Sequence, residues 1–139
     1  MKENTYKLFL DDNVERRWPP SKVVWVPGMV YDDNDNWILC QNYDEFVSCI
    51  LKNGLPEFIS FDHDLSYEHE KEGARVNFTK FFDYSRVEEK TGLHCAKWLV
   101  DYCIDNKLKL PEYVIHSMNT GGVVNISTYL KNAKLNAKL

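Results

Sequence analysis

Three short apolar segments, each followed directly by polar residues, constrain the fold of this chain most. The segments and the residues after them are 6–10 with Asp11 and Asp12, 58–61 with Asp62, His63 and Asp64, and 113–115 with His116 and Ser117. Continuous apolar runs of this length are typical of strands buried on both faces of a parallel sheet. Because ligands bind beyond the carboxyl ends of the strands in such sheets, we expect these polar residues to share one site.

Segments with helical periodicity separate and follow these strands. Asn42, followed three residues later by Glu45, resembles a capping box, and apolar residues at helical spacing continue to a stop at Gly54. Thr91 and Asn119 precede two further segments in which apolar residues recur at helical spacing. This alternation of strands and helices predicts an α/β fold.

Residues 16–20 are expected to form a loop, because they carry no helical period. Residues 23–26 are strand-like and end at a Pro-Gly pair. Residues 29–31 and 37–40 are expected to pair as a hairpin around the Asp- and Asn-rich turn between them.

Residues 66–90 form a long polar connection with an aromatic cluster at Phe78, Phe81, Phe82 and Tyr84. A connection of this length inside a domain is usually functional or mobile. We therefore expect it to be a lid over the site.

Length and composition are those of one ordinary globular domain, residues 1–139. The formal net charge of −4 argues against duplex nucleic acid as a partner, since such binding needs a basic face. No apolar run approaches the roughly 18 residues that span a bilayer, and no signal peptide precedes the first strand, so we expect a cytoplasmic protein without a membrane partner. Cys40, Cys49, Cys95 and Cys103 lie in apolar segments without a C-x-x-C pair, which favours buried free thiols over zinc or disulfides.

The carboxylates of Asp11, Asp12, Asp62 and Asp64 would repel one another in a shared crevice, so some must bind protons or a cation must enter. Hard oxygen ligands favour Mg²⁺, Mn²⁺ or Ca²⁺. Asp62 and Asp64 lie two residues apart in an extended segment, so both can face the same side. His116 beside these acids is a candidate general acid or phosphate donor; the alternative is a core or capping histidine.

The turn at residues 119–122 enters a helix directly after Ser117. Backbone N–H groups and the positive end of the helix dipole point outward at such a turn and can hold an anion. We expect Ser117, Asn119, Gly121 and Gly122 to bind phosphate; the alternative is routine helix capping. Loop arginines that can reach the same site, or else carry solvated surface charge, are Arg16, Arg17 and Arg75.

The order of these clusters resembles that of response-regulator receiver domains, which carry an acidic pair after the first strand, an Asp after the third, and Ser or Thr after the fourth. A closer resemblance is to cyclic-phosphate-processing receiver domains, with motifs F-L-D-D, F-D-H-D-L, T-G followed by A-x-W-L, and H-S-x-N-x-x-G. The matching segments are residues 9–12, 61–65, 91–92 with 96–99, and 116–119 with Gly122. They span about four fifths of the chain.

The resemblance implies a receiver-like (flavodoxin-like) three-layer sandwich with a mainly parallel central sheet. The chain departs from a true receiver because a loop and hairpin insertion replaces the first helix, and the fifth strand is missing or degenerate. No Lys follows such a strand, which argues against phosphoryl signalling. On this match Asp11 and Asp12 take the metal-binding acidic positions, Asp62 the phosphoacceptor position and Ser117 the hydroxyl position.

The function that the resemblance implies is a metal-dependent phosphoesterase acting on cyclic phosphates of nucleotides or RNA ends, with Mg²⁺ or Mn²⁺ as cofactor. The residues expected to act are, for the metal, Asp11, Asp12 and Asp62, and, for the chemistry, His116 as proton donor with His63 and Asp64 assisting. Two alternatives stay open: a non-catalytic protein that sequesters a cyclic nucleotide, and a degenerate receiver that works as an interaction module. The oligomeric state is not predicted.

Overall fold

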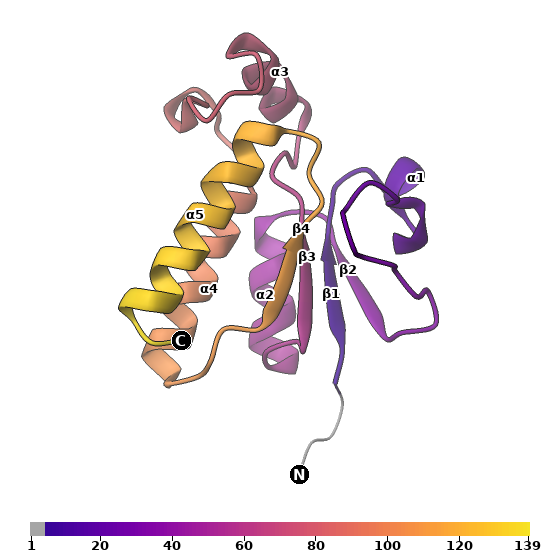
Figure 1. Ribbon diagram of the computed structural model, residues 1–139, viewed down its shortest axis with the longest axis vertical. Coiled ribbons are helices and arrows are strands. Elements are labelled where there is room, and N and C mark those ends of the chain that lie inside the picture. Colours follow the sequence, from indigo (N-terminus) through magenta and orange to yellow (C-terminus); the bar gives the residue numbers. More distant parts are fainter. Residues whose placement is uncertain (1–4) are drawn as a thin grey trace.

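Four parallel strands form a single sheet in the order β2-β1-β3-β4 (Figure 1). The strands are β1 (Lys7–Leu10), β2 (Trp37–Cys40), β3 (Phe58–Phe61) and β4 (Glu112–Ile115). The computed structural model describes residues 5–139; residues 1–4, on which the expectation of no signal peptide rests, lie outside them. Within the described residues this is the strand order of a receiver-like sheet without its fifth strand, so the predicted fold class is confirmed.

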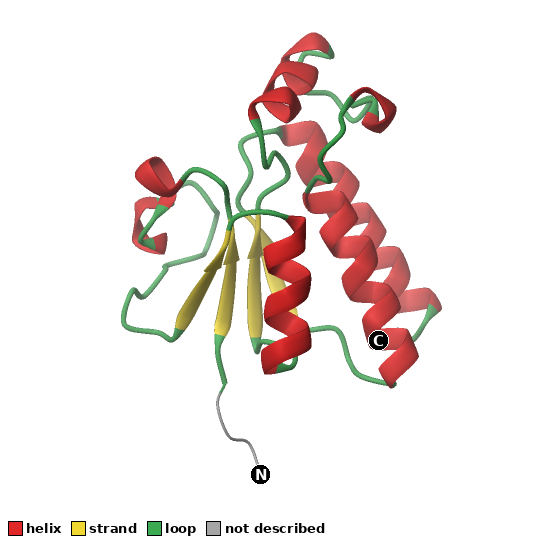
Figure 2. Ribbon diagram, turned by 180° about the vertical axis from the view of Figure 1, so that it is seen from behind, coloured by secondary structure: helices red, strands yellow, loops and turns green. Residues whose placement is uncertain are grey.

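Three long helices pack against one face of the sheet, namely α2 (Tyr43–Asn53), α4 (Gly92–Asn106) and α5 (Thr120–Asn136). Figure 2 shows α2 in front of the strands, with α4 and α5 side by side next to it. The side chains of Asn42, Thr91 and Asn119 each accept a hydrogen bond from a backbone N–H in the first turn of the helix that follows. The three predicted helix starts are therefore confirmed.

Side chains of β1 alternate between the two faces of the sheet. Leu8 and Leu10 are fully buried beneath the long helices, together with Ile59 and Phe61 of β3. Phe9 points to the opposite face, where it packs in a smaller cluster against aromatic rings such as Tyr31 and Trp37. The sheet is therefore buried on both faces, although helices cover only one of them.

The second face is covered by residues 13–36, which contain only the single turn α1 (Val14–Arg17) and the 3-10 turn η1 (Pro20–Lys22). The expected replacement of the first helix by an insertion is confirmed, but the predicted hairpin is wrong. Trp37 starts β2 beside Lys7 in a parallel pairing, so the chain must first cross back over the sheet. Residues 23–26 and 29–31 form no strand, and Val23 and Tyr31 instead bury their side chains beside Phe9.

The long connection at residues 66–90, which we call the insertion from here on, is folded back on the start of α5. It contains α3 (Tyr67–Arg75), which the sequence did not lead us to expect, and the 3-10 turn η2 (Tyr84–Arg86). The carbonyl of Phe78 accepts hydrogen bonds from the backbone N–H of Gly121, at 2.9 Å, and from the Thr120 hydroxyl, at 3.0 Å. A Cβ on Gly121 would overlap the carbonyl of Thr79, so this close approach needs glycine.

Cys40, Cys49, Cys95 and Cys103 are buried free thiols, as predicted. Among residues 5–139, none of the helices has the length and apolar character required to cross a bilayer.

Candidate functional site

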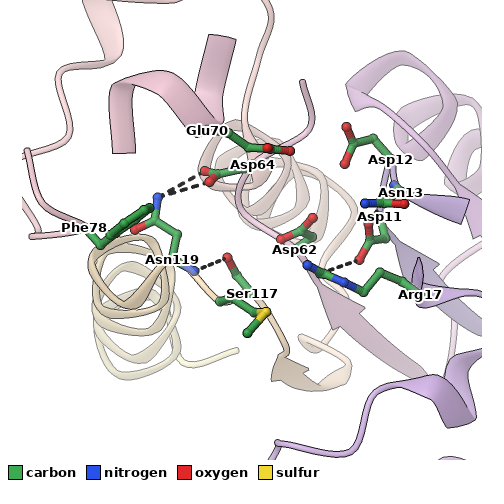
Figure 3. A pocket seen from close by; sticks show the side chains of 11 residues that line it. Asp11, Asp12, Asn13, Arg17, Asp62, Asp64, Glu70, Phe78, Ser117 and Asn119 are labelled. Carbon is green, nitrogen blue, oxygen red and sulfur yellow. Dashed lines mark hydrogen bonds and ion pairs between the residues drawn. The ribbon is translucent and has the colours of Figure 1, made fainter. Parts of the chain in front are cut away.

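A cavity of about 330 Å³ opens where β1, β3 and β4 end (Figure 3). Acidic and polar side chains dominate its lining, which consists of Asp11, Asp12, Asn13, Arg17, Asp62, Asp64, Glu70, Phe78, Ser117, Met118 and Asn119. Parallel strands direct their carboxyl ends to the same edge, which is why residues far apart in sequence converge here. Asp11, Asp12, Asp62, Asp64 and Ser117 thus line one cavity, whereas His63 and His116 of the same strand ends do not.

The acidic side chains of the cavity carry more negative charge than its one lining cation, Arg17, can offset. Burial and the nearby Asp11 carboxylate raise the pKa of Asp62 well above its ordinary value. Burial, Asp11 and Glu70 raise the pKa of Asp12 from 3.8 to about 6. Without a proton or a cation, this cluster opposes its own ionisation.

Asp11 is 1% exposed, and hydrogen bonds hold its carboxylate from three directions. Oδ1 accepts from the backbone N–H of Asn13 at 2.8 Å. Oδ2 accepts from Arg17 at 3.2 Å and lies 2.8 Å from Nε2 of His116. The orientation of this carboxylate is therefore fixed by the surrounding protein.

His116 lies behind Asp11, inside the second face of the sheet. Its ring stacks on Phe9 with 4.6 Å between ring centroids, and it is 0% exposed. Its Nδ1 lies 2.7 Å from the Ser60 hydroxyl, which in turn lies 2.7 Å from the Tyr31 hydroxyl. These contacts form a buried chain Tyr31–Ser60–His116–Asp11, which we call the aspartate relay.

The direction of the aspartate relay follows from the charge state of the histidine. Burial lowers the pKa of His116, so the ring is neutral near pH 7. Because the Asp11 carboxylate can only accept, Nε2 carries the ring hydrogen and Nδ1 accepts from Ser60. His116 is absent from the cavity lining, and its ring hydrogen is directed to Asp11 rather than into the cavity.

A second buried histidine lies behind Asp64. His63 Nδ1 is 2.6 Å from Asp64 Oδ1, and His63 Nε2 is 2.8 Å from the Tyr84 hydroxyl. Asn119 Nδ2 also donates to Asp64 Oδ1, at 3.1 Å. A Cβ on Gly122 would overlap the His63 ring, so glycine allows the start of α5 to approach this pair. Asp64 itself faces the cavity, whereas His63 is buried behind it.

The predicted phosphate-binding residues are divided between two roles. Ser117 and Asn119 line the cavity. Gly121 and Gly122 do not, since the N–H of Gly121 donates to Phe78 and that of Gly122 to the Asn119 side chain. Their N–H groups are thus engaged within the chain, and the glycines serve close packing instead.

Buried Asp11, Asp62 and His116 each have a ligand-type atom within 4.8 Å of the others, which is close enough for a metal ion. Because Nε2 of His116 donates to Asp11 and Nδ1 accepts from Ser60, the two carboxylates are the free ligands of this group. Asp12 lines the same cavity but is not part of this close group. The carboxylate oxygens are hard donors that suit Mg²⁺ or Mn²⁺. The excess of negative charge around these oxygens would stabilise a bound cation, so the residues present fit a divalent metal ion.

Of the loop arginines, Arg17 reaches the cavity and bonds Asp11. Arg16 is exposed, and Arg75 instead forms two hydrogen bonds to Glu72 within the insertion. Glu70 and Phe78 of the expected lid segment also line the cavity, although neither was among the predicted site residues. The signal for Glu70 was Ser66, whose side chain accepts from His69 N and starts the helix that carries Glu70.

The fold and the acidic cavity together define a receiver-like domain. The family model of cyclic-phosphate processing receiver domains matches residues 6–132, and the chain belongs to that family. Membership supports a role in cyclic-phosphate processing. No curated protein and no solved structure matches the chain significantly.

Proposed function

We propose that this protein is a Mg²⁺- or Mn²⁺-dependent phosphoesterase that opens cyclic phosphates of nucleotides or RNA ends. The observation that carries the proposal is the pairing of Asp11 and Asp62 in one cavity whose charge is unbalanced. Family membership adds the substrate class, since it associates this domain with cyclic-phosphate processing. Catalysis and metal dependence are our proposal and do not follow from family membership.

Asp11 and Asp62 would hold the cation, with Asp12 contributing from the edge of the cavity. Asp62 Oδ1 accepts from the backbone N–H of His63 at 2.8 Å, which directs the carboxylate. A bound divalent cation would lower the pKa of water and offset the charge of the phosphate. In this proposal the aspartate relay sets the position of Asp11, and His116 is a positioning residue rather than the proton donor first expected.

Ser117 and Arg17 are the groups that would orient the phosphate. The Ser117 hydroxyl oxygen accepts from Asn119 N at 3.1 Å, which leaves its hydrogen free to donate to a phosphate oxygen. Arg17 lies at the cavity edge with 14% of its side chain exposed and uses one nitrogen for Asp11. Its remaining N–H groups suit a phosphate oxygen.

Asp64 is the group we assign to proton transfer. It faces the cavity while His63 and Asn119 hold its carboxylate from behind. Asp64 accepts a proton from water as the water oxygen bonds to phosphorus; the ring P–O bond breaks, and the leaving alkoxide takes a proton from solvent. The product is a phosphate monoester from a cyclic monophosphate or an RNA end.

Product analysis by chromatography tests the proposal. Cyclic mononucleotides, cyclic dinucleotides and RNA ending in a cyclic phosphate are incubated with the protein in Mg²⁺ or Mn²⁺ and, separately, in EDTA. We expect a ring-opened product only with the cation, and its loss in Asp62→Asn but not in Glu57→Gln, an exposed residue that precedes β3 at the opposite end of the sheet. Ring opening in EDTA, or full activity of Asp62→Asn, would overturn the metal-dependent reaction.

Phe78 favours a second candidate, a non-catalytic binder of cyclic nucleotides. Its ring lines the cavity and is 43% exposed, so a base can stack on it. Saturable binding of a cyclic nucleotide, measured by calorimetry, with no product under any of the conditions above would favour this candidate.

A further inference from the structure

A groove separate from the acidic cavity lies between α4 and α5, beside the insertion. The charge of its lining is opposite to that of the cavity. The groove has a volume of about 510 Å³, and its lining consists of Lys80, Tyr84, Leu93, Lys97, Val124, Asn125, Thr128, Tyr129 and Asn132. This lining contains two lysines and no Asp or Glu. Although the whole chain has a net charge of −4, α5 itself contains no acidic residue.

Aromatic rings accompany both lysines of the groove. Lys97 Nζ lies 5.7 Å from the centroid of the Tyr129 ring, and Lys80 Nζ lies 5.6 Å from that of Phe81. Phe81 is 71% exposed although it is a large apolar side chain. Lysines that neutralise phosphates, combined with exposed rings that stack on bases, are typical of surfaces that bind single-stranded nucleic acid.

The groove is connected to the acidic cavity by a short stretch of the insertion. Phe78 lines the cavity, and Lys80, two residues later, lines the groove. The carbonyl of Phe78 is bonded to Gly121, and that of Lys80 accepts from Asn125 Nδ2 at 3.2 Å. These bonds fix residues 78–81 on the first turns of α5, between the two hollows.

The groove then continues away from the cavity along α5. Its lining residues extend from Val124 to Asn132, which corresponds to about 12 Å of helix axis. Asn125, Thr128 and Asn132 supply polar side chains along this length. A polymer seated there would have one end directed towards Asp11 and Asp62.

We propose that the groove between α4 and α5 binds single-stranded RNA and leads its 3′ end, which carries the cyclic phosphate, to the acidic cavity. This inference rests on the proposed function, because it selects RNA ends over free cyclic mononucleotides as the substrate class. Lys80 and Lys97 contact backbone phosphates, and Phe81 stacks on a base. The acidic cavity receives only the terminal phosphate, together with its cation.

Fluorescence anisotropy with a short labelled single-stranded RNA tests the groove separately from the chemistry. The RNA carries a 3′-hydroxyl and the buffer contains EDTA, so that neither a cation nor a reaction contributes. We expect Lys80→Gln/Lys97→Gln to weaken binding and to reduce the slope of log K against log salt by about 1.4, since each phosphate contact on a single strand contributes about 0.7. The matched control is Lys52→Gln/Lys109→Gln, which removes the same charge from exposed positions outside the groove.

Phe81→Ala provides a variant that removes stacking without changing charge. Loss of one stacked base corresponds to a decrease in affinity of at least about fivefold. Tyr67→Ala, a 74% exposed aromatic residue of the same insertion, should leave the affinity unchanged. Because Phe81 and both lysines are exposed, folding of these variants is checked by thermal unfolding and is expected to match wild type.

The outcomes separate this inference from the proposed function. RNA binding that depends on Lys80, Lys97 and Phe81 supports the groove even if no ring opening is found in any substrate. Ring opening of a cyclic mononucleotide, together with RNA affinity equal in the groove and control variants, would overturn the groove and leave the proposed function standing. Equal competition by polyaspartate of matched charge would also overturn it, because the groove would then recognise negative charge and not RNA.

Discussion

The Nε2 atom of His116 lies 2.8 Å from Oδ2 of Asp11, and the two side chains are 0% and 1% exposed. This contact joins the end of β4 to the end of β1 at the floor of the acidic cavity. A neutral histidine that donates to a buried carboxylate fixes its orientation, as partners behind metal ligands do. The contact therefore fixes the cavity floor from inside the protein and is not itself exposed to solvent.

Two substitutions of His116 distinguish its two hydrogen bonds. His116→Gln places an amide N–H near the position of Nε2 and can retain the bond to Asp11, whereas His116→Asn places its amide near Nδ1 and can retain the bond to Ser60. Both leave one buried group unpaired, so each should lower the free energy of unfolding by about 1–3 kcal/mol. Calorimetric titration with Mn²⁺ should show weaker binding in His116→Asn than in His116→Gln; the reverse order would contradict a role through Asp11.

The raised pKa of Asp12 predicts that the stability of the protein depends on pH when divalent cations are absent. Its folded-state pKa of about 6 lies above the ordinary 3.8, so the folded protein binds this proton more tightly than the unfolded chain does. Stability should therefore fall as the pH rises from about 4 through about 6. In EDTA, Asp12→Asn should have the higher Tm at pH 7 and approach the wild-type value near pH 4. Glu57→Gln is the control, and a wild-type Tm equal to that of Asp12→Asn at pH 7 would contradict the prediction.

Glu72 holds the insertion together, and its loss should loosen that segment. Its buried carboxylate accepts from the side chains of Arg75 and Arg86 and from the backbone N–H of Asp83. Arg75 and these other donors lower the pKa of Glu72 to about 2, so the carboxylate is ionised throughout the usual pH range. Glu72→Gln weakens these charge-assisted bonds.

Hydrogen exchange measures this effect. Amides in residues 76–90 should exchange about tenfold faster or more in Glu72→Gln, and trypsin should cleave the segment sooner. Glu88→Gln, an exposed residue of the same insertion, should behave like wild type. Equal protection of the segment in both variants would show that its order does not depend on Glu72.

The lid prediction for residues 66–90 is tested by exchange with ligand bound. Phe78 lines the cavity, and the backbone of Phe78 and Lys80 is bonded to α5, so a ligand that fills the cavity should slow exchange around residues 78–84. The measurement uses a cyclic nucleotide at saturation and Mg²⁺. Unchanged exchange in these amides would mean that the insertion is a fixed wall of the site.

The strands, the long helices and the convergence of the strand ends were predictable because each depends on local signals. Continuous apolar runs marked the strands, and Asn42, Thr91 and Asn119 marked the helix starts. The acidic residues of the cavity followed from the rule that parallel strands present their carboxyl ends together.

The features that the sequence did not predict depend on contacts between distant segments. The expected hairpin at residues 29–40 had suitable turn residues. However, β2 pairs in parallel with β1, and residues 29–31 form no strand. The burial of His116 depends on Phe9 and on the crossing segment that contributes Tyr31, and no local pattern indicates either contact. Likewise, α3 is polar and buries only a few residues, so it lacks the apolar stripe by which helices are normally found.

The contact between Asp11 and His116 joins residues that are 105 positions apart in the chain. Closure of so long a loop is entropically unfavourable until the intervening elements have packed, so contacts of this kind form late in folding. The floor of the cavity is therefore completed only when β4 has joined the sheet. A chain emerging from the ribosome would have no complete binding site until β4 and His116 had been made.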